Sequence, residues 1–159
     1  MAILKHISVK NRFYSSAVEY LTCQFDEYTN KPVLDEKGRI QERENYLIVG
    51  VNCDVDSFGA ECIEVNRLYG KNNSVKDVKA HHYIISFEPN DPITIEQASE
   101  FGKQWLSVFA PGHQAVVAVH PDGHNGSQNM HVHMVINSVR KYAGKQSRWH
   151  EKPCEWKLG

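Results

Sequence analysis

Three histidines near the end of the chain have a type and spacing suited to metal binding. His131 and His133 are two residues apart in the segment 130–137, and His120 precedes them by a Gly-containing stretch. Residues two apart on a β-strand point to the same face, so His131 and His133 would project side by side. If residues 121–128 form a loop that returns the chain, the strand ending at His120 pairs with the next strand and brings the third imidazole beside them.

Three imidazoles on one sheet face would form an open site for a divalent metal ion. No fourth protein ligand is evident, so positions would remain for water or a phosphate oxygen, as in catalytic metal centres. The simpler alternative is that the His-x-His pair is only two partly exposed histidines on a strand. Asp122, two residues after His120, could orient an imidazole or could simply form the turn before Gly123.

A phosphate held by a metal needs an attacking group, and three tyrosines are candidates for that role. Tyr20 lies in a short predicted helix that includes residues 17–21. A phenol oxygen that attacks phosphorus forms a covalent phosphotyrosine, and a Lewis acid stabilises the charge that develops on the phosphate. Tyr14 and Tyr142 are competitors, and Tyr20 itself could equally be a core residue of its helix.

Composition places the chain among globular domains. It has 159 residues, 41% of them hydrophobic and 23% charged, which excludes a disordered, collagen-like or coiled-coil protein. No apolar run approaches the roughly 20 residues of a membrane span, and the first residues do not form a signal peptide, so we expect a cytoplasmic protein. The four cysteines lack CxxC spacing, which argues against a zinc ribbon or a disulfide framework.

Charge is unevenly distributed along the chain. The net charge of −1 does not by itself indicate a nucleic-acid partner. Basic segments at 1–22, 65–80 and 139–159 nevertheless alternate with acidic segments at 23–64 and 81–138. The basic segments could share one face that binds phosphates, or they could be ordinary solvated loops.

The hydrophobic pattern predicts strands alternating with helices, followed by two consecutive strands. The polar segment 26–45 indicates a long loop or an exposed hairpin, and Thr94 and Gln97 have the spacing of a helix capping box. Two consecutive strands at the end require antiparallel pairing, so we predict an α/β sandwich with helices covering one face of a mainly antiparallel sheet. The expected strands are 2–9, 46–51, 82–87, 115–120 and 129–139, and the expected helices are 17–21, 56–69 and 94–109.

Several motifs, in order along the chain, resemble one family. They are Ala17–Leu21, Ala80–Phe87, Pro111–His113, His120–Asp122 and His131–Val139. Together they resemble the MobA-like conjugative relaxases of the MOBP class, which are HUH endonucleases that start the transfer of plasmids or conjugative transposons. The resemblance runs from about residue 2 to residue 145, nearly the whole chain.

The resemblance implies both a fold and a mechanism. The fold is the α+β fold of HUH endonucleases, a two-layer sandwich with a central, mainly antiparallel five-stranded sheet and flanking helices. His120, His131 and His133 would hold one divalent ion, Mn²⁺ or Mg²⁺, against the scissile phosphate at the nic site of the transfer origin, oriT. Tyr20 would attack that phosphate, stay linked to the 5′ end and later religate the strand. Three nitrogen ligands suit Mn²⁺ better than Mg²⁺ by ligand softness, so we expect Mn²⁺ in a purified sample.

The remaining implied roles concern catalysis and binding. Asp122 matches the acidic residue of the family's motif, and His82 matches the histidine before a Ser-Phe pair, so both would support catalysis. The partners would be single-stranded DNA at oriT, accessory relaxosome proteins and a coupling protein. We expect residues 1–159 to be one nuclease domain at the N-terminal end of a longer protein. The expected DNA contacts are Lys5, Lys10, Arg12, Lys76, Lys79, Ser86, Asn137, Arg140 and Lys141.

Two other functions stay open. A rolling-circle replication initiator or a transposase of the same superfamily would carry its tyrosine downstream of the His-x-His strand, where only Tyr142 follows. A non-catalytic DNA-binding module with a structural zinc would need its metal in order to fold.

Overall fold

Five strands and three helices make up the residues that the computed structural model describes, which are 2–10, 14–23, 31, 33–41, 46–121 and 129–142. The predicted alternation of strands and helices is confirmed. In chain order the elements are β1 (Ala2–Val9), α1 (Tyr14–Thr22), β2 (Leu47–Val51), α2 (Phe58–Leu68), β3 (Ala80–Phe87), α3 (Ile95–Phe109), β4 (His113–His120) and β5 (His131–Arg140).

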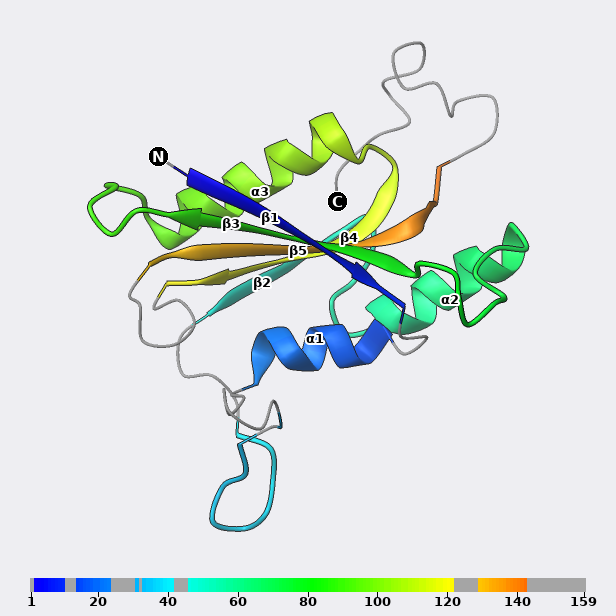
Figure 1. The fold of residues 1–159 in the computed structure, drawn as a ribbon, viewed down its shortest axis with the longest axis horizontal. Helices are drawn as coiled ribbons and strands as arrows, with labels where there is room; N and C mark the ends of the chain where they lie inside the picture. Colours follow the sequence, from blue (N-terminus) through cyan, green and yellow to red (C-terminus); the bar gives the residue numbers. More distant parts are fainter. Residues whose placement is uncertain are drawn as a thin grey trace.

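The strands form one sheet with the order β1-β3-β5-β4-β2, in which every neighbouring pair is antiparallel. β5 is the central strand, and β1 and β2 are the edges (Figure 1). The predicted α+β fold with an antiparallel five-stranded sheet is therefore confirmed. His120 on β4 pairs directly with His131 on β5, so the two strands of the predicted metal site are neighbours.

Helices cover both faces of this sheet, and the predicted two-layer arrangement is corrected to three layers. α3 lies on one face, in the core that contains Val117, Val132 and Met134, whereas α1 and α2 lie on the other face, in the core that contains Val116 and Val135 (Figure 1). Successive residues of β4 and β5 point to opposite faces of the sheet, and both faces carry apolar side chains. Each face must therefore be covered by its own helices.

The start of α3 and its distance from the sheet are both set by particular residues. The predicted capping box is present, because Gln97 N donates to Thr94 Oγ1 over 3.1 Å and Thr94 N donates to Gln97 Oε1 over 2.9 Å. In the middle of the helix, a Cβ added at Gly102 would lie 2.8 Å from Val117 Cγ1 and 3.0 Å from Val132 Cγ1. The glycine therefore allows α3 to approach the sheet closely.

Helix α1 begins at Tyr14, earlier than predicted, because the side chain of Tyr14 is anchored in the core. The Tyr14 hydroxyl lies 3.0 Å from Asn137 Oδ1 and 3.1 Å from the Lys79 carbonyl, and it accepts a hydrogen bond of 2.7 Å from Asn66 Nδ2. Only 3% of Tyr14 is exposed. These bonds fix the first turn of α1 to β5 and to α2.

Part of the polar segment 26–45 forms the predicted exposed hairpin. Leu34 and Ile40 make an isolated antiparallel bridge. Between them, Asp35 Oδ1 accepts from the backbone N–H groups of Lys37 and Arg39, and Gly38 has a φ of 78°, which favours glycine.

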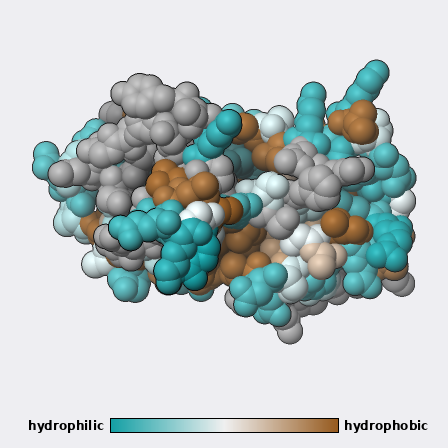
Figure 2. Space-filling model, turned by 90° about the horizontal axis from the view of Figure 1, so that it is seen from below, coloured by the Kyte–Doolittle hydropathy of each residue, from teal (hydrophilic) through white to brown (hydrophobic). Residues whose placement is uncertain are grey.

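The surface seen from below the view of Figure 1 is mainly hydrophilic, with separate hydrophobic patches (Figure 2). Among the described residues, no helix combines the length and the apolar character that crossing a bilayer requires.

Candidate active site

The three predicted metal ligands are neighbours on the sheet face that carries α1. The ring centroids of His120 and His133 are 4.5 Å apart, and those of His131 and His133 are 6.2 Å apart. His120 and His133 are fully buried, and His131 is half-buried. The structure therefore brings together three histidines that the strand period and the returning loop predicted to converge.

A fourth histidine, His82 on β3, joins this group. Its Nε2 lies 2.9 Å from Nδ1 of His133, and only 7% of His82 is exposed. One of these two nitrogens donates a hydrogen bond to the other. If Nδ1 of His133 is the donor, its Nε2 is the acceptor nitrogen, which is the atom that a metal ion would bind. This position agrees with the supporting role predicted for His82.

A backbone carbonyl of α1 fixes the tautomer of His120. His120 Nε2 lies 2.7 Å from the carbonyl oxygen of Leu21. Because a carbonyl can only accept, Nε2 carries the hydrogen and Nδ1 is the acceptor nitrogen of the ring. The same bond ties the last turn of α1 to the histidines. Tyr20 precedes Leu21 in this helix, and its side chain lies outside the described residues.

The donor set suits a divalent metal ion, although the rings are not arranged as ligands. His120 Nδ1, His131 Nδ1 and His133 Nε2 are all buried from solvent, and neutral imidazole nitrogen is a common metal ligand. Within the described ranges, however, no group of three or more His, Cys, Asp or Glu side chains is arranged to hold an ion. The rings would have to turn on their strands to share one ion. The predicted supporting residue Asp122 lies outside the described residues.

Tyr14 is placed as a structural residue and not as a nucleophile. Its hydroxyl is buried among Asn66, Asn137 and the Lys79 carbonyl. Burial raises the pKa of the Tyr14 hydroxyl, and the hydrogen bond from Asn66 only partly opposes this effect. Formation of a phenolate is therefore disfavoured there, which leaves Tyr14 the weaker candidate.

Tyr142 lies at the opposite end of β5 from the histidines. Its backbone N–H donates to the Gly112 carbonyl over 3.3 Å. Arg140 at the end of β5 follows His133 by seven residues, and an extended strand rises about 3.3 Å per residue, so the end of the strand that precedes Tyr142 is roughly 23 Å from His133. Of the three candidate tyrosines, Tyr20 is thus the one whose backbone is next to the histidine group.

Comparison with known proteins identifies the family. Residues 28–156 match the family model described as "Relaxase: MobA/VirD2-like, nuclease domain". The chain belongs to the MobA/VirD2-like relaxase family. It is 36% identical over 103 residues to the protein rlx of Staphylococcus aureus, and 40% identical over 99 residues to the group II intron-interrupted relaxase LtrB of Lactococcus lactis subsp. cremoris. These matches span 65% and 62% of this chain but only 30% and 15% of the two relatives.

Two predicted DNA contacts of this relaxase domain are near the histidines. Lys5 on β1 is exposed, and it pairs with Ile84 on β3, which in turn pairs with His133. Ser86 pairs with His131. Side chains that are paired across neighbouring strands share a face, so Lys5 and Ser86 lie on the side of the sheet that carries the histidine group.

The predictions that Asn137 and Lys79 contact DNA are corrected, because both residues are buried in the relaxase domain. Asn137 is fully buried, and its Nδ2 donates to Asn66 Oδ1 and to Gln114 Oε1, each over 3.2 Å. Lys79 is 4% exposed, and its ammonium donates to the carbonyls of Ser74 and Asp77. Both side chains make hydrogen bonds within the protein, so neither is available to contact DNA.

The other predicted contacts lie toward the opposite end of the strands. Lys10 follows β1 and Lys76 precedes β3, and both are exposed. Arg140 ends β5, and Lys141 donates from Nζ to the Asn52 carbonyl over 3.1 Å. Arg12 lies outside the described residues. The basic side chains therefore flank the relaxase fold at a distance from the histidines.

Two features of the site had no signal in the sequence. One is the bond from His120 to the Leu21 carbonyl, because a backbone acceptor 99 positions away leaves no residue pattern. The other is the polar network around Tyr14, whose members are far apart in the sequence and form no recognisable motif.

Proposed function

We propose that this relaxase domain nicks one strand of DNA at a specific site in a transfer origin, using Tyr20 as the nucleophile and a divalent metal ion, Mn²⁺ or Mg²⁺. The observation that carries the proposal is the bond between His120 and the Leu21 carbonyl. It joins the helix turn that contains Tyr20 to a group of four histidines, in a chain of the relaxase family.

The proposed reaction exchanges one phosphodiester for another. The Tyr20 oxygen loses its proton and attacks the scissile phosphorus, the bond from phosphorus to the 3′ oxygen breaks, and that oxygen leaves as a 3′ hydroxyl with a proton. The DNA 5′ end stays linked to Tyr20 as a phosphotyrosine. Because one phosphodiester replaces another, the exchange is close to thermoneutral, and the free 3′ hydroxyl can reverse it and religate the strand.

In this proposal His120, His131 and His133 hold the metal ion, which would polarise the phosphate as a Lewis acid. His82 orients His133 through the 2.9 Å bond between their rings. The Leu21 carbonyl orients His120 in the same way. We assign Asp122 a supporting role. In the cell, accessory relaxosome proteins and a coupling protein would act with the domain in the cytoplasm.

The test is formation of a covalent DNA adduct. The protein is incubated with Mn²⁺ and single-stranded oligonucleotides that tile the transfer origin of the element encoding it, then boiled in detergent and separated by electrophoresis. Wild-type protein should give an adduct, and Tyr20→Phe should give none. Tyr69→Phe is the matched control, because Tyr69 is 44% exposed and directly follows α2.

An adduct that persists in Tyr20→Phe and disappears in Tyr142→Phe would instead support the replication initiator or transposase alternative. Chelation of the metal distinguishes the proposed enzyme from a non-catalytic module with a structural zinc. For the proposed enzyme, EDTA should stop cleavage and leave the melting temperature nearly unchanged. A structural zinc would make EDTA unfold the protein.

A further inference from the structure

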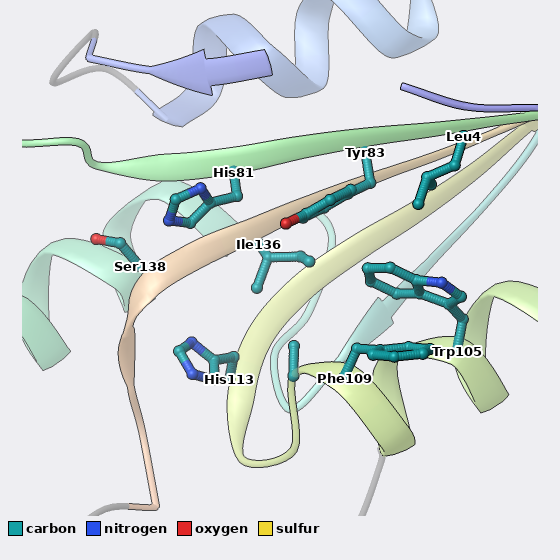
Figure 3. A pocket seen from close by; sticks show the side chains of 9 residues that line it. Leu4, His81, Tyr83, Trp105, Phe109, His113, Ile136 and Ser138 are labelled. Carbon is teal, nitrogen blue, oxygen red and sulfur yellow. The ribbon is translucent and has the colours of Figure 1, made fainter. Parts of the chain in front are cut away.

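A second cluster of aromatic and histidine side chains lies on the other face of the sheet. There, a cavity of about 440 Å³ opens between the strands and the second half of α3 (Figure 3). His81 and Tyr83 contribute to it, whereas the intervening His82 points to the histidine group of the opposite face. Its lining residues are Leu4, His81, Tyr83, Trp105, Phe109, Ala110, His113, Ile136 and Ser138. We call it the α3 pocket.

The rings around the α3 pocket form a continuous series. The centroids of His6 and Tyr83 are 4.6 Å apart, those of Tyr83 and Trp105 are 4.8 Å apart, and those of Trp105 and Phe109 are 4.8 Å apart. Phe109 is 65% exposed and Trp105 is half-buried. An aromatic series that ends in an exposed ring presents apolar faces on which a planar ligand can stack.

Burial favours the uncharged form of both histidines in the α3 pocket. Burial lowers the pKa of His81, as does the neighbouring His6, whose Nε2 lies 2.9 Å from His81 Nδ1. Burial also lowers the pKa of His113, against the opposing effect of its bond to the Asn137 carbonyl. Neutral imidazoles can both donate and accept hydrogen bonds. None of the described residues that line the pocket is acidic or a permanent cation.

Stacking faces beside neutral donors and acceptors match the chemistry of a nucleobase. A carboxylate or a phosphate would require positive charge inside the pocket. The positive charge is instead at its margin, where Arg140 pairs with His113 across β4 and β5. This arrangement suits a base inside the cavity and a phosphate outside it.

The sheet edge offers a route between the two faces. β1 is an edge strand, and only β3 separates it from β5. Lys5 lies on the face of the histidine group, and its neighbour Leu4 lines the α3 pocket. With strands about 4.8 Å apart, β1 is roughly 10 Å from β5. A flexible single strand held beside the exposed Lys5 can therefore cross the β1 edge and reach the pocket.

We propose that the α3 pocket binds an unstacked base of single-stranded DNA that crosses the β1 edge, as a second contact away from the site of nicking. The proposal uses the proposed function only in taking DNA as the substrate.

Binding in EDTA tests this proposal without cleavage. Fluorescence anisotropy measures the affinity for a labelled 30-nucleotide single strand of mixed sequence. Base–aromatic stacking contributes about 1–3 kcal/mol per base, so Phe109→Ala and Trp105→Leu should each weaken binding about fivefold or more. Phe101→Ala is the matched control, because Phe101 is an exposed aromatic residue of the same helix outside the pocket. The affinity of this variant for the strand should stay within about twofold of wild type. Phe109 is exposed enough that its removal should leave the fold intact.

A second measurement moves an abasic position along the strand. For wild type, the missing base should weaken binding when it is at one particular position of the strand. In Trp105→Leu, the affinity should not depend on the position of the missing base. The proposal is overturned if the pocket variants bind like Phe101→Ala, or if wild type does not bind the strand. Loss of affinity in the pocket variants, together with an absence of any nicked adduct, would overturn the proposed function and leave the pocket standing.

Discussion

His81 and His82 are adjacent in sequence, yet they belong to two regions of different character. His82 lies with His120, His133 and the half-buried His131 on the sheet face that carries α1, where its ring is hydrogen-bonded to His133. His81 lies on the other face in the α3 pocket, beside Tyr83. One strand thus supplies a histidine to each region.

The difference between the regions lies in what surrounds the imidazoles. In the histidine group the rings lie beside other imidazoles and a helix carbonyl, and they would have to turn on their strands to share the metal ion that we propose. In the α3 pocket they lie among aromatic rings at an open cavity, so they are suited to a planar ligand. The residue type is the same, and the neighbours determine the chemistry.

The largest expected effect comes from removing two rings of the histidine group. His131→Ala combined with His133→Ala should lower the rate of adduct formation at saturating DNA about a hundredfold or more, because stabilisation of charge by a metal ion contributes several kcal/mol to catalysis. Adduct formation with Mn²⁺ measures this, and circular dichroism checks the fold. Val108→Ala, an exposed change on α3 outside the pocket, is the control. An unchanged rate in the double variant would refute the assignment of the metal ligands.

The second prediction concerns the support of the face that carries the histidine group. Tyr14→Phe should lower the free energy of unfolding by about 2–3 kcal/mol, since it leaves buried Asn137, Asn66 and the Lys79 carbonyl without a hydrogen-bond partner at that position. Chemical denaturation measures the change. Tyr69→Phe, which removes an exposed hydroxyl, should change stability by less than about 0.5 kcal/mol. Equal effects of the two variants would show that the Tyr14 network contributes little.

Local patterns in the sequence predicted the strands, the antiparallel sheet and the capping box of α3. The same is true of the convergence of His120, His131 and His133, because strand period and a returning loop are local properties. Burial of Asn137 and Lys79 could not be predicted in this way. The Tyr14 hydroxyl that bonds to Asn137 is 123 positions away in the sequence. From the sequence alone, Asn137 is therefore predicted to be a polar residue on the surface. The α3 pocket was missed for the same reason, since its rings come from separate elements.

A smaller effect is expected on the face of the α3 pocket. Gly102→Ala would place a Cβ 2.8 Å from Val117 Cγ1 and 3.0 Å from Val132 Cγ1. Overpacking of this kind costs about 1–3 kcal/mol, and the better helix propensity of alanine returns up to about 1 kcal/mol, so a net loss of about 1 kcal/mol is expected. Lys103→Ala, on the neighbouring position of the helix, is the control for denaturation. A stabilised Gly102→Ala would mean that α3 is able to move away from the sheet without loss.

The smallest effect is a pH dependence that belongs to the pocket and involves His113. Burial lowers the pKa of His113 in the folded state below its ordinary value of 6.5. The unfolded chain then binds a proton more readily than the folded protein, so this contribution to stability is fully present above about pH 6.5 and is lost as the pH falls toward the lowered pKa. Thermal unfolding of wild type should therefore shift to lower temperature between pH 7 and pH 5. In His113→Gln, whose amide can still donate to the Asn137 carbonyl but does not titrate, the shift should be smaller. Identical shifts in the two proteins would mean that the acid sensitivity arises elsewhere in the protein.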